Sequence, residues 1–326
     1  MDIREDIADL MAGCVGCGQC REVCPSLPYG GSDPMAVMNG EDGNVLSCMG
    51  CGRCSSTCGF TDPHRVMMYM KHRESGASVP DSFLRSGFVM PVADHPSRGE
   101  LSPEWRGDDV LLMAGCTVEC RLPFLKHAGA KALEAIGIAC GDLPGSSCCM
   151  FPVPLRGLTE GERDSYKQRM GRSAGGKGIV TLCPGCSHEL SESGVRAENI
   201  VHTLSRNTYR ISGLNRLSLK VAIQPGCRDD VTVEDIKSIV LATGASYSGN
   251  STGCCGKTIK GISEVLMKER QREMEGADAV VVACPSCFSR YDSATDGVPV
   301  LHVSELVALA YGDRSTLKYH MIPPDF

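Results

Sequence analysis

Two sets of five cysteines have the residue type and the spacing for metal chemistry. The later set consists of Cys227, the pair Cys254-Cys255 followed by glycine, and the motif from Cys284 to Cys287. Adjacent cysteines are poor disulfide partners, because their Cα atoms lie too close for relaxed S–S geometry. Two neighbouring thiolates can instead bind one iron–sulfur cluster. The same order occurs earlier in the chain as Cys116, Cys148, Cys149, Cys183 and Cys186.

Each set closes with a Cys-Pro-x-Cys motif that follows an apolar run. These runs are residues 178–182 and 280–283, and a helix is expected to begin at each motif. The amides at a helix N-terminus stabilise negative charge, so two thiolates placed there are favoured. We therefore predict one cluster in each set.

Eight further cysteines near the N-terminus form two matched runs, each with the spacing C-x2-C-x2-C-x3-C. This is the run of bacterial two-cluster ferredoxins, in which the fourth cysteine ligates the other cluster. Two zinc sites would tolerate the CxxC pairs but would not explain two matched runs of four. Cluster 1 is therefore expected to take Cys14, Cys17, Cys20 and Cys58, and cluster 2 to take Cys24, Cys48, Cys51 and Cys54.

Composition argues against several other classes of protein. The chain has 326 residues, 20 of them cysteines, and a net charge of −6. It has no basic stripe for nucleic acid, no apolar run long enough to cross a bilayer and no signal-peptide core at its N-terminus. Secreted disulfide frameworks are usually much shorter chains. We expect a cytoplasmic protein, with any peripheral attachment to a membrane made through a partner.

The order of motifs predicts an α+β chain of several domains. Strand–helix alternation in each five-cysteine segment argues for α/β layers with largely parallel strands. Two such repeats around a pseudo-twofold axis would bring both cluster sites to one cleft. The expected parts are a mainly helical two-[4Fe–4S] ferredoxin-type domain, a proline-rich linker anchored by Phe83, Leu84, Phe88, Val89 and Trp105, and two repeats, at residues 1–75, 76–108, 109–215 and 216–326.

The two five-cysteine sets resemble the duplicated CCG domain in the B-type subunit of heterodisulfide reductase, and residues 1–75 resemble the C-type subunit of that enzyme. The chain therefore resembles a natural fusion of the two. The resemblance implies a noncubane [4Fe–4S] cluster on each set and reduction, between them, of the disulfide of coenzyme M and coenzyme B. It also implies that all ten cysteines of the two sets are catalytic ligands. One departure is Met150, where the motif has glycine, and it is expected to change the shape of that pocket.

Several residues outside the cysteine sets are candidates for other roles. Cys120 could replace Cys116 as a ligand, but only Cys116 has a counterpart in the second repeat, and Cys140 is expected to be a small buried side chain. His202 and His302 occupy matching phrases in the two repeats and are expected to pack or form hydrogen bonds at helix starts. Cations near the motifs could bind an anionic substrate. Arg228 and Lys257 are the favoured pair, ahead of Arg121, Arg156 and Lys260.

No nucleotide-binding loop is found in the sequence, so electrons are expected from a separate flavoprotein that resembles the A-type subunit of heterodisulfide reductase. Hydrogenase or formate dehydrogenase could supply that flavoprotein with electrons. The predicted function is reduction of a small disulfide, with electrons passing through the two ferredoxin cubanes. One alternative is an iron–sulfur relay for a flavin-dependent 2-hydroxy-acid or glycerol-3-phosphate dehydrogenase. Another is a reductive activation factor for a second protein.

Overall fold

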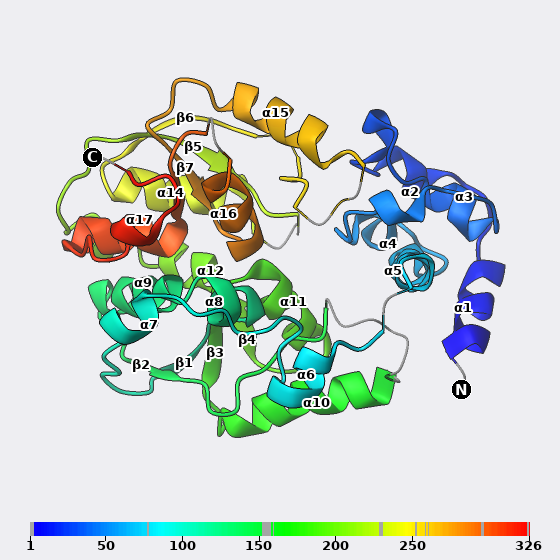
Figure 1. Cartoon of the computed structure of the whole chain (residues 1–326), viewed down its shortest axis with the longest axis horizontal. Coiled ribbons are helices and arrows are strands. Elements are labelled where there is room, and N and C mark those ends of the chain that lie inside the picture. Colours follow the sequence, from blue (N-terminus) through cyan, green and yellow to red (C-terminus); the bar gives the residue numbers. More distant parts are fainter. Residues whose placement is uncertain are drawn as a thin grey trace.

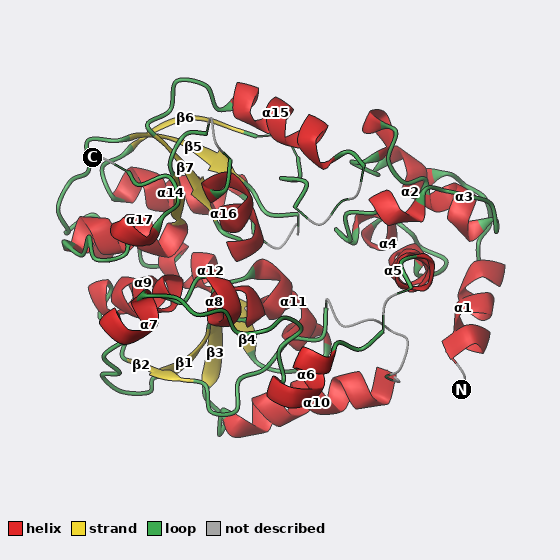
Figure 2. Cartoon of the chain, in the orientation of Figure 1, coloured by secondary structure: helices red, strands yellow, loops and turns green. Residues whose placement is uncertain are grey.

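The computed structural model describes most of the chain. It covers residues 3–76, 78–151, 158, 160–227, 231–251, 253–257, 259, 261–294, 297–324 and 326, with the side chains of residues 3 and 160 left out. Figure 1 shows a helical N-terminal module at one end of the molecule and, beside it, two α/β halves stacked on each other. Figure 2 shows that the strands lie within these two halves. The α+β architecture predicted from the sequence is confirmed.

The N-terminal module consists of short helices around two glycine-rich cysteine loops. Its longest helix, α5, begins after Asp62, whose carboxylate accepts a hydrogen bond from the Arg65 amide. A core of Ile7, Val37, Val66 and Met67 joins α1, α3 and α5. The elements are α1 (Ile3–Ala12), α2 (Gln19–Glu22), η1 (Leu27–Tyr29), α3 (Pro34–Met38), η2 (Val45–Ser47), α4 (Arg53–Ser56) and α5 (Pro63–Glu74).

Each α/β half contains one four-stranded parallel sheet, and the two sheets have the same order. The first is β2-β1-β3-β4 and the second is β6-β5-β7-β8. The central strands are short apolar runs, as expected for strands covered on both faces. The strands are β1 (Val110–Met113), β2 (Cys140–Asp142), β3 (Gly178–Thr181), β4 (Ala197–Asn199), β5 (Lys220–Gln224), β6 (Ser246–Asn250), β7 (Ala279–Val282) and β8 (Val300–His302).

Helices pack around both sheets and join the halves through one continuous core. The central contact is between α9 (Phe124–Ala135) and α17 (Val303–Tyr311), and α12 (Ile200–Ser205) packs on α14 (Val233–Ala242). The Phe124 ring meets that of Phe288 edge-on across this junction, with ring centroids 5.7 Å apart. The other helices of the halves are α8 (Cys116–Arg121), α10 (Glu160–Ser173), α11 (Pro184–Glu192), α13 (Thr208–Ile211), α15 (Ser263–Glu273), α16 (Pro285–Asp292) and η3 (Leu317–Tyr319).

The proline-rich linker carries α6 (Asp81–Ser86) and α7 (Ser97–Glu100) and packs on the first half. Phe83 is buried against Cys116 and Cys148, and its ring meets that of Tyr166 edge-on at 5.2 Å. Two of the predicted anchors are wrong, because Leu84 is 68% exposed and Trp105 is 37% exposed. The linker therefore helps to build the first cysteine site instead of only spanning a distance.

No helix in the described part of the chain is long and apolar enough to span a bilayer.

Candidate iron–sulfur centres

The described residues include all twenty cysteines, and none of them forms a disulfide. Eighteen are the predicted cluster cysteines, and they lie in four groups. No three His, Cys, Asp or Glu side chains in the described ranges are spaced to hold one metal ion. A [4Fe–4S] cluster needs a different arrangement, since its thiolates bind separate irons.

In the N-terminal module each group draws its fourth cysteine from the other run. Burial raises the pKa of the Cys20 thiol, and the neighbouring thiols Cys14, Cys17 and Cys58 raise it further. Burial likewise raises the pKa of Cys54, which is surrounded by Cys48, Cys51 and Cys24. These are the two sets of four predicted for cluster 1 and cluster 2.

Glycines shape the two cysteine loops identically. Gly16 and Gly50 have φ values of 70° and 67°, in the left-handed region that glycine adopts most readily. Gly18 and Gly52 precede α2 and α4 with φ values of 79° and 84°. The turn after Cys48 directs the Gly50 amide at the Cys48 Sγ atom, 3.4 Å away. Such N–H donors stabilise a thiolate and tune a cluster's potential.

The two loops differ in their surroundings. Val15 in the first loop is 59% exposed, whereas its counterpart in the second, Met49, is 7% exposed. Cys17 is exposed, and burial raises the pKa of its counterpart Cys51 to about 11. Cluster 1 would therefore lie at the surface and cluster 2 against the rest of the protein.

The first five-cysteine set meets around the N-termini of two helices. Cys116 begins α8, and Cys183 is the N-cap of α11. Hydrogen bonds with Cys116 and Cys149 raise the pKa of Cys148 well above its usual range. Hydrogen bonds with Cys149 and Cys183 do the same for Cys186. All five thiols are thus linked.

The second set repeats this arrangement. The Cys227 and Cys254 Sγ atoms are 3.2 Å apart, and the Gly256 amide points at Cys254 Sγ from 3.4 Å. Hydrogen bonds with Cys255 and Cys284 raise the pKa of Cys287. The pair at 254–255 therefore lies beside the other three thiols.

The two sets also touch each other. Hydrogen bonds from Cys183 of the first set and from Cys287 hold the pKa of the Cys284 thiol well below its usual range. The ten thiols of the two sets are buried or half-buried and form hydrogen bonds with one another. Iron bound to them would remove their protons, because a thiol that coordinates a metal is deprotonated. The residues present therefore fit two clusters that face each other across the junction of the halves.

The departure at Met150 does not alter the backbone. Met150 has φ of 75°, and Gly256, its counterpart, has φ of 77°. Both turns are therefore left-handed, although such a conformation is strained for a non-glycine residue. The Met150 side chain is fully buried beside Phe83, Cys116 and Cys148. The expected change of pocket shape thus comes from this side chain; most of the loop that follows, at 152–157, lies outside the described residues.

The loop of cluster 2 contacts both halves. Met49 and Cys51 pack in one apolar cluster with Cys227 and Cys254, and a cavity of about 420 Å³ opens between them. Gly50 faces the other half, where a Cβ atom would lie 3.0 Å from the Phe151 ring. Phe151 in turn packs with Cys149 and Cys183. One ferredoxin loop therefore lies next to both five-cysteine sets.

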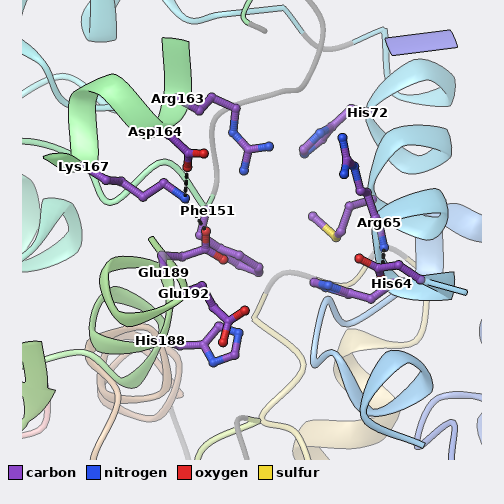
Figure 3. A pocket seen from close by; sticks show the side chains of 12 residues that line it. His64, Arg65, His72, Phe151, Arg163, Asp164, Lys167, His188, Glu189 and Glu192 are labelled. Atoms are coloured by element: carbon purple, nitrogen blue, oxygen red, sulfur yellow. Dashed lines mark hydrogen bonds and ion pairs between the residues drawn. The ribbon is translucent and has the colours of Figure 1, made fainter. Parts of the chain in front are cut away.

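A second cavity, of about 200 Å³, marks the seam between α5 and helices α10 and α11 (Figure 3). Lys167 binds Asp164 at 3.1 Å and lies 3.7 Å from Glu189. Burial lowers the pKa of His72 to about 4, and the charges of Lys71 and Arg163 contribute. His72 is therefore neutral at physiological pH, and the seam combines charged pairs with the Phe151 ring.

The structure also locates the other predicted residues. The Cys120 thiol donates to the Met90 carbonyl at 3.3 Å, and the neighbouring Cys116 is among the groups that raise its pKa, after burial. Cys140 is buried at the start of β2, and burial raises its pKa to about 11. Lys257 is exposed and reaches Ser289 Oγ at 3.2 Å. Arg228 lies outside the described residues, as do Arg156 and Lys260.

The hydrogen bonds by which Gln224 supports the second cysteine set were not predicted from the sequence. Gln224 ends β5 and accepts hydrogen bonds from Tyr291 at 2.6 Å and from Ser251 at 2.7 Å. Its amide donates to the Gly253 carbonyl at 2.7 Å, just before the cysteine pair. The signal that could have indicated this role is a polar residue at the end of an otherwise apolar strand.

The match of His202 with His302 is wrong. Strand pairing aligns Asn199 with Thr181 in the first sheet and His302 with Val282 in the second. Asn199 and His302 are both N-caps, of α12 and α17. His302 therefore corresponds to Asn199, and His202 occupies the place of Glu305. The sequence alignment was misled because Ile200-Val201-His202 is similar to Val300-Leu301-His302, whereas the strand pairing places the two segments three residues out of that alignment.

Comparisons with known proteins agree with this arrangement. The 4Fe-4S dicluster domain family matches residues 7–59, and the Cysteine-rich domain family matches residues 110–191 and 221–290. The chain thus joins a dicluster ferredoxin domain to a duplicated Cysteine-rich domain, and this domain content defines its class.

Within that class, the chain is similar to reductase subunits of methanogens. It is 25% identical over 271 residues to the B-type subunit of the ferredoxin:CoB-CoM heterodisulfide reductase of Methanosarcina mazei, covering 62% of this chain and 88% of that protein. It is 23% identical over 327 residues to the B-type subunit of the fumarate reductase (CoM/CoB) of Methanothermobacter marburgensis, covering 92% of this chain. The chain spans 61% of the length of that fumarate reductase subunit. The resemblance predicted from the sequence is confirmed.

Proposed function

We propose that this chain is the iron–sulfur subunit of a reductase that cleaves a small disulfide of the coenzyme M–coenzyme B type. The observation that carries the proposal is the contact between Cys183 and Cys284, which brings two complete five-cysteine sets to one junction. Two one-electron centres facing one another suit a disulfide, because its cleavage requires two electrons and two protons to give two thiols. The names of the relatives, which are reductase subunits acting with these coenzymes, support the same choice.

The route of electrons follows from the exposure of the ferredoxin loops. A donor would reach cluster 1 at the surface beside Val15 and Cys17, and cluster 2 lies against both five-cysteine sets. The proposed ligands are the cysteines grouped above. When bound, the four clusters would supply the electron transfer, and the protein's part is to hold them in line and exclude water. We propose a flavoprotein as the donor.

Lys257 is the described cation proposed to bind an acidic group of the substrate. It follows the second cysteine pair, and its ammonium group is exposed. A sulfonate, phosphate or carboxylate entering the junction would meet it at the mouth of the second set. Arg228 remains a sequence-based proposal for the same role.

The decisive test uses anaerobically purified protein with iron and sulfide quantified. The coenzyme M–coenzyme B disulfide is added with reduced methyl viologen as electron donor. We expect Cys255→Ser to abolish thiol formation while the ferredoxin EPR signals persist. Cys140→Ala is the matched control, since that thiol is buried but belongs to no set. Unchanged turnover in Cys255→Ser would refute the proposal.

A second candidate is the same chemistry in the opposite direction. The relative that covers 92% of this chain is named as part of a fumarate reductase (CoM/CoB). In that direction, two thiols would be oxidised to the disulfide with release of two protons, and two electrons would leave through cluster 1 to a flavoprotein acceptor. Initial rates measured with the two thiols and an acceptor of higher potential, such as methylene blue, against rates with the disulfide and reduced viologen, separate the two directions.

A further inference from the structure

His302 lies at the junction of the halves and belongs to none of the cysteine sets. It ends β8, caps the N-terminus of α17 and is completely buried. Its Nε2 atom is 3.1 Å from the carbonyl oxygen of Leu182 and 3.2 Å from that of Ala283. Leu182 immediately precedes Cys183, and Ala283 immediately precedes Cys284. One ring nitrogen therefore touches the equivalent point of both repeats.

The other side of the ring defines its tautomer. Nδ1 accepts a hydrogen bond from the backbone amide of Ser304, at 3.3 Å. Because an amide nitrogen can only donate, Nδ1 carries no proton in this arrangement. The single N–H of the neutral ring is then at Nε2, where it is shared between the two carbonyls.

The first repeat provides an internal comparison. Asn199 also caps a helix, because its Oδ1 accepts from the Val201 amide at 3.0 Å. Its Nδ2 donates to the Thr181 carbonyl at 3.3 Å, within its own half. Helix capping therefore needs no histidine, and the contact that His302 adds is the one to Leu182 across the junction.

We propose that His302 is a positioning residue that sets the separation of the two five-cysteine sites. A shift of Leu182 relative to Ala283 would carry Cys183 and Cys284 with it, and these thiols meet at the same junction. Its effect on turnover rests on the proposed function, because the two sulfur atoms of a disulfide must be reached from both sites at once. Its effect on the distance between the sites does not.

The test compares variants that keep the cap. His302→Asn supplies the residue of the first repeat, and His302→Asp keeps a capping oxygen but has no N–H to donate. Asn199→Ala is the matched control, since it removes a cap without touching the junction. The readouts are the magnetic interaction between the two CCG clusters by EPR, the iron content, and kcat and KM with the coenzyme M–coenzyme B disulfide.

We expect both His302 variants to change the intercluster interaction and to lower kcat about 10- to 100-fold, with little change in KM, since misplacement of about 1 Å costs rates of this order. Asn199→Ala should leave the interaction unchanged. One further outcome separates the two proposals. If the His302 variants change the magnetic interaction between the clusters but no protein, wild type included, reduces the disulfide, the positioning role is supported and the proposed function is refuted. An unchanged interaction and kcat in His302→Asp would overturn the positioning role.

Loss of the CCG clusters is informative as well. If the His302 variants fail to take up these clusters while Asn199→Ala takes them up, the junction contact is needed to form the sites, which supports the proposal. If all three fail equally, any change at these two strand ends prevents cluster uptake and the contact with Leu182 is not what matters, so the proposal is overturned.

Discussion

The two α/β halves share a sheet order and a cysteine arrangement, yet they meet the same backbone requirements with different residues. After the cysteine pair, the left-handed turn is made by Met150 in one half and by Gly256 in the other. At the last strand, the cap is Asn199 in one and His302 in the other. The comparison shows that both halves keep the same backbone conformation at these positions. The side chains packed around each position decide which residue can adopt it.

Space explains why glycine stands in the second half. A Cβ atom on Gly256 would lie 3.0 Å from the Ser263 carbonyl oxygen and 3.2 Å from its Cα atom. In the first half, the Met150 side chain instead fills a pocket beside Phe83. The strain of a left-handed methionine, about 1 kcal/mol or more, is there offset by burial.

The largest effect is expected from placing methionine in the second half. Gly256→Met combines backbone strain with overpacking against Ser263, and it should destabilise the holoprotein by about 4 kcal/mol. Anaerobic denaturant titration measures this loss, and iron content shows whether the second set still binds its cluster. Wild-type stability would mean that space does not distinguish the two turns.

The reciprocal change should cost less. Met150→Gly loses a fully buried side chain, a loss of about 3 kcal/mol, but it relieves about 1 kcal/mol of strain. We therefore expect a net destabilisation of about 2 kcal/mol, by the same titration. Met150→Ala keeps the strain and serves as the control; it should be no more stable than Met150→Gly.

Loss of the Asn199 cap should affect only its own half, unlike loss of the His302 side chain. Asn199→Ala removes the side-chain bond to the Val201 amide and should destabilise the protein by about 1 kcal/mol. The EPR signals of both CCG clusters should remain as in the wild type. A change in the signal of the second half's cluster would show that Asn199 acts beyond its own repeat.

The smallest effect concerns a buried ion pair in the second half. Glu305, at the position of His202, binds His320 at 2.9 Å, and both side chains are fully buried. Burial alone would lower the pKa of His320, but Glu305, with Asp292, raises it above its ordinary value of 6.5. The stabilisation is therefore fully present below pH 6.5 and is lost as pH rises through the higher folded value.

This pH dependence can be isolated with His320→Gln. The difference in stability between the wild type and the variant should shrink above pH 6.5, with a slope below about 1.4 kcal/mol per pH unit, the limit for one proton. Denaturant titrations at several pH values measure it. A difference that grows with pH would mean that the folded pKa of His320 is lowered.

Much of this fold could be predicted from the sequence, because cysteine spacing and apolar runs are local signals. The strands before each Cys-Pro-x-Cys motif and the helices after them were predicted and are present at β3, β7, α11 and α16. The edge strands β2 and β6 were missed, since Cys140–Asp142 and Ser246–Asn250 contain few strand-forming apolar residues. Their strand character comes from pairing with β1 and β5, which is a tertiary effect.

The site was predictable as sets of cysteines but not as a junction. Spacing indicated which thiols belong together, and the structure groups them in that way. The contact of Cys183 with Cys284, the double acceptor of His302 and the side of the ferredoxin loop that Met49 covers all depend on how the halves pack. No local pattern contains that information.

The unequal surroundings of Val15 and Met49 have a consequence for how the molecule handles charge. Under the proposed function, an exposed first loop and a covered second one would make cluster 1 the centre of the ferredoxin module that a redox partner reaches most directly. Electron transfer in either direction would then depend on the redox partner that binds the surface beside Val15 and Cys17.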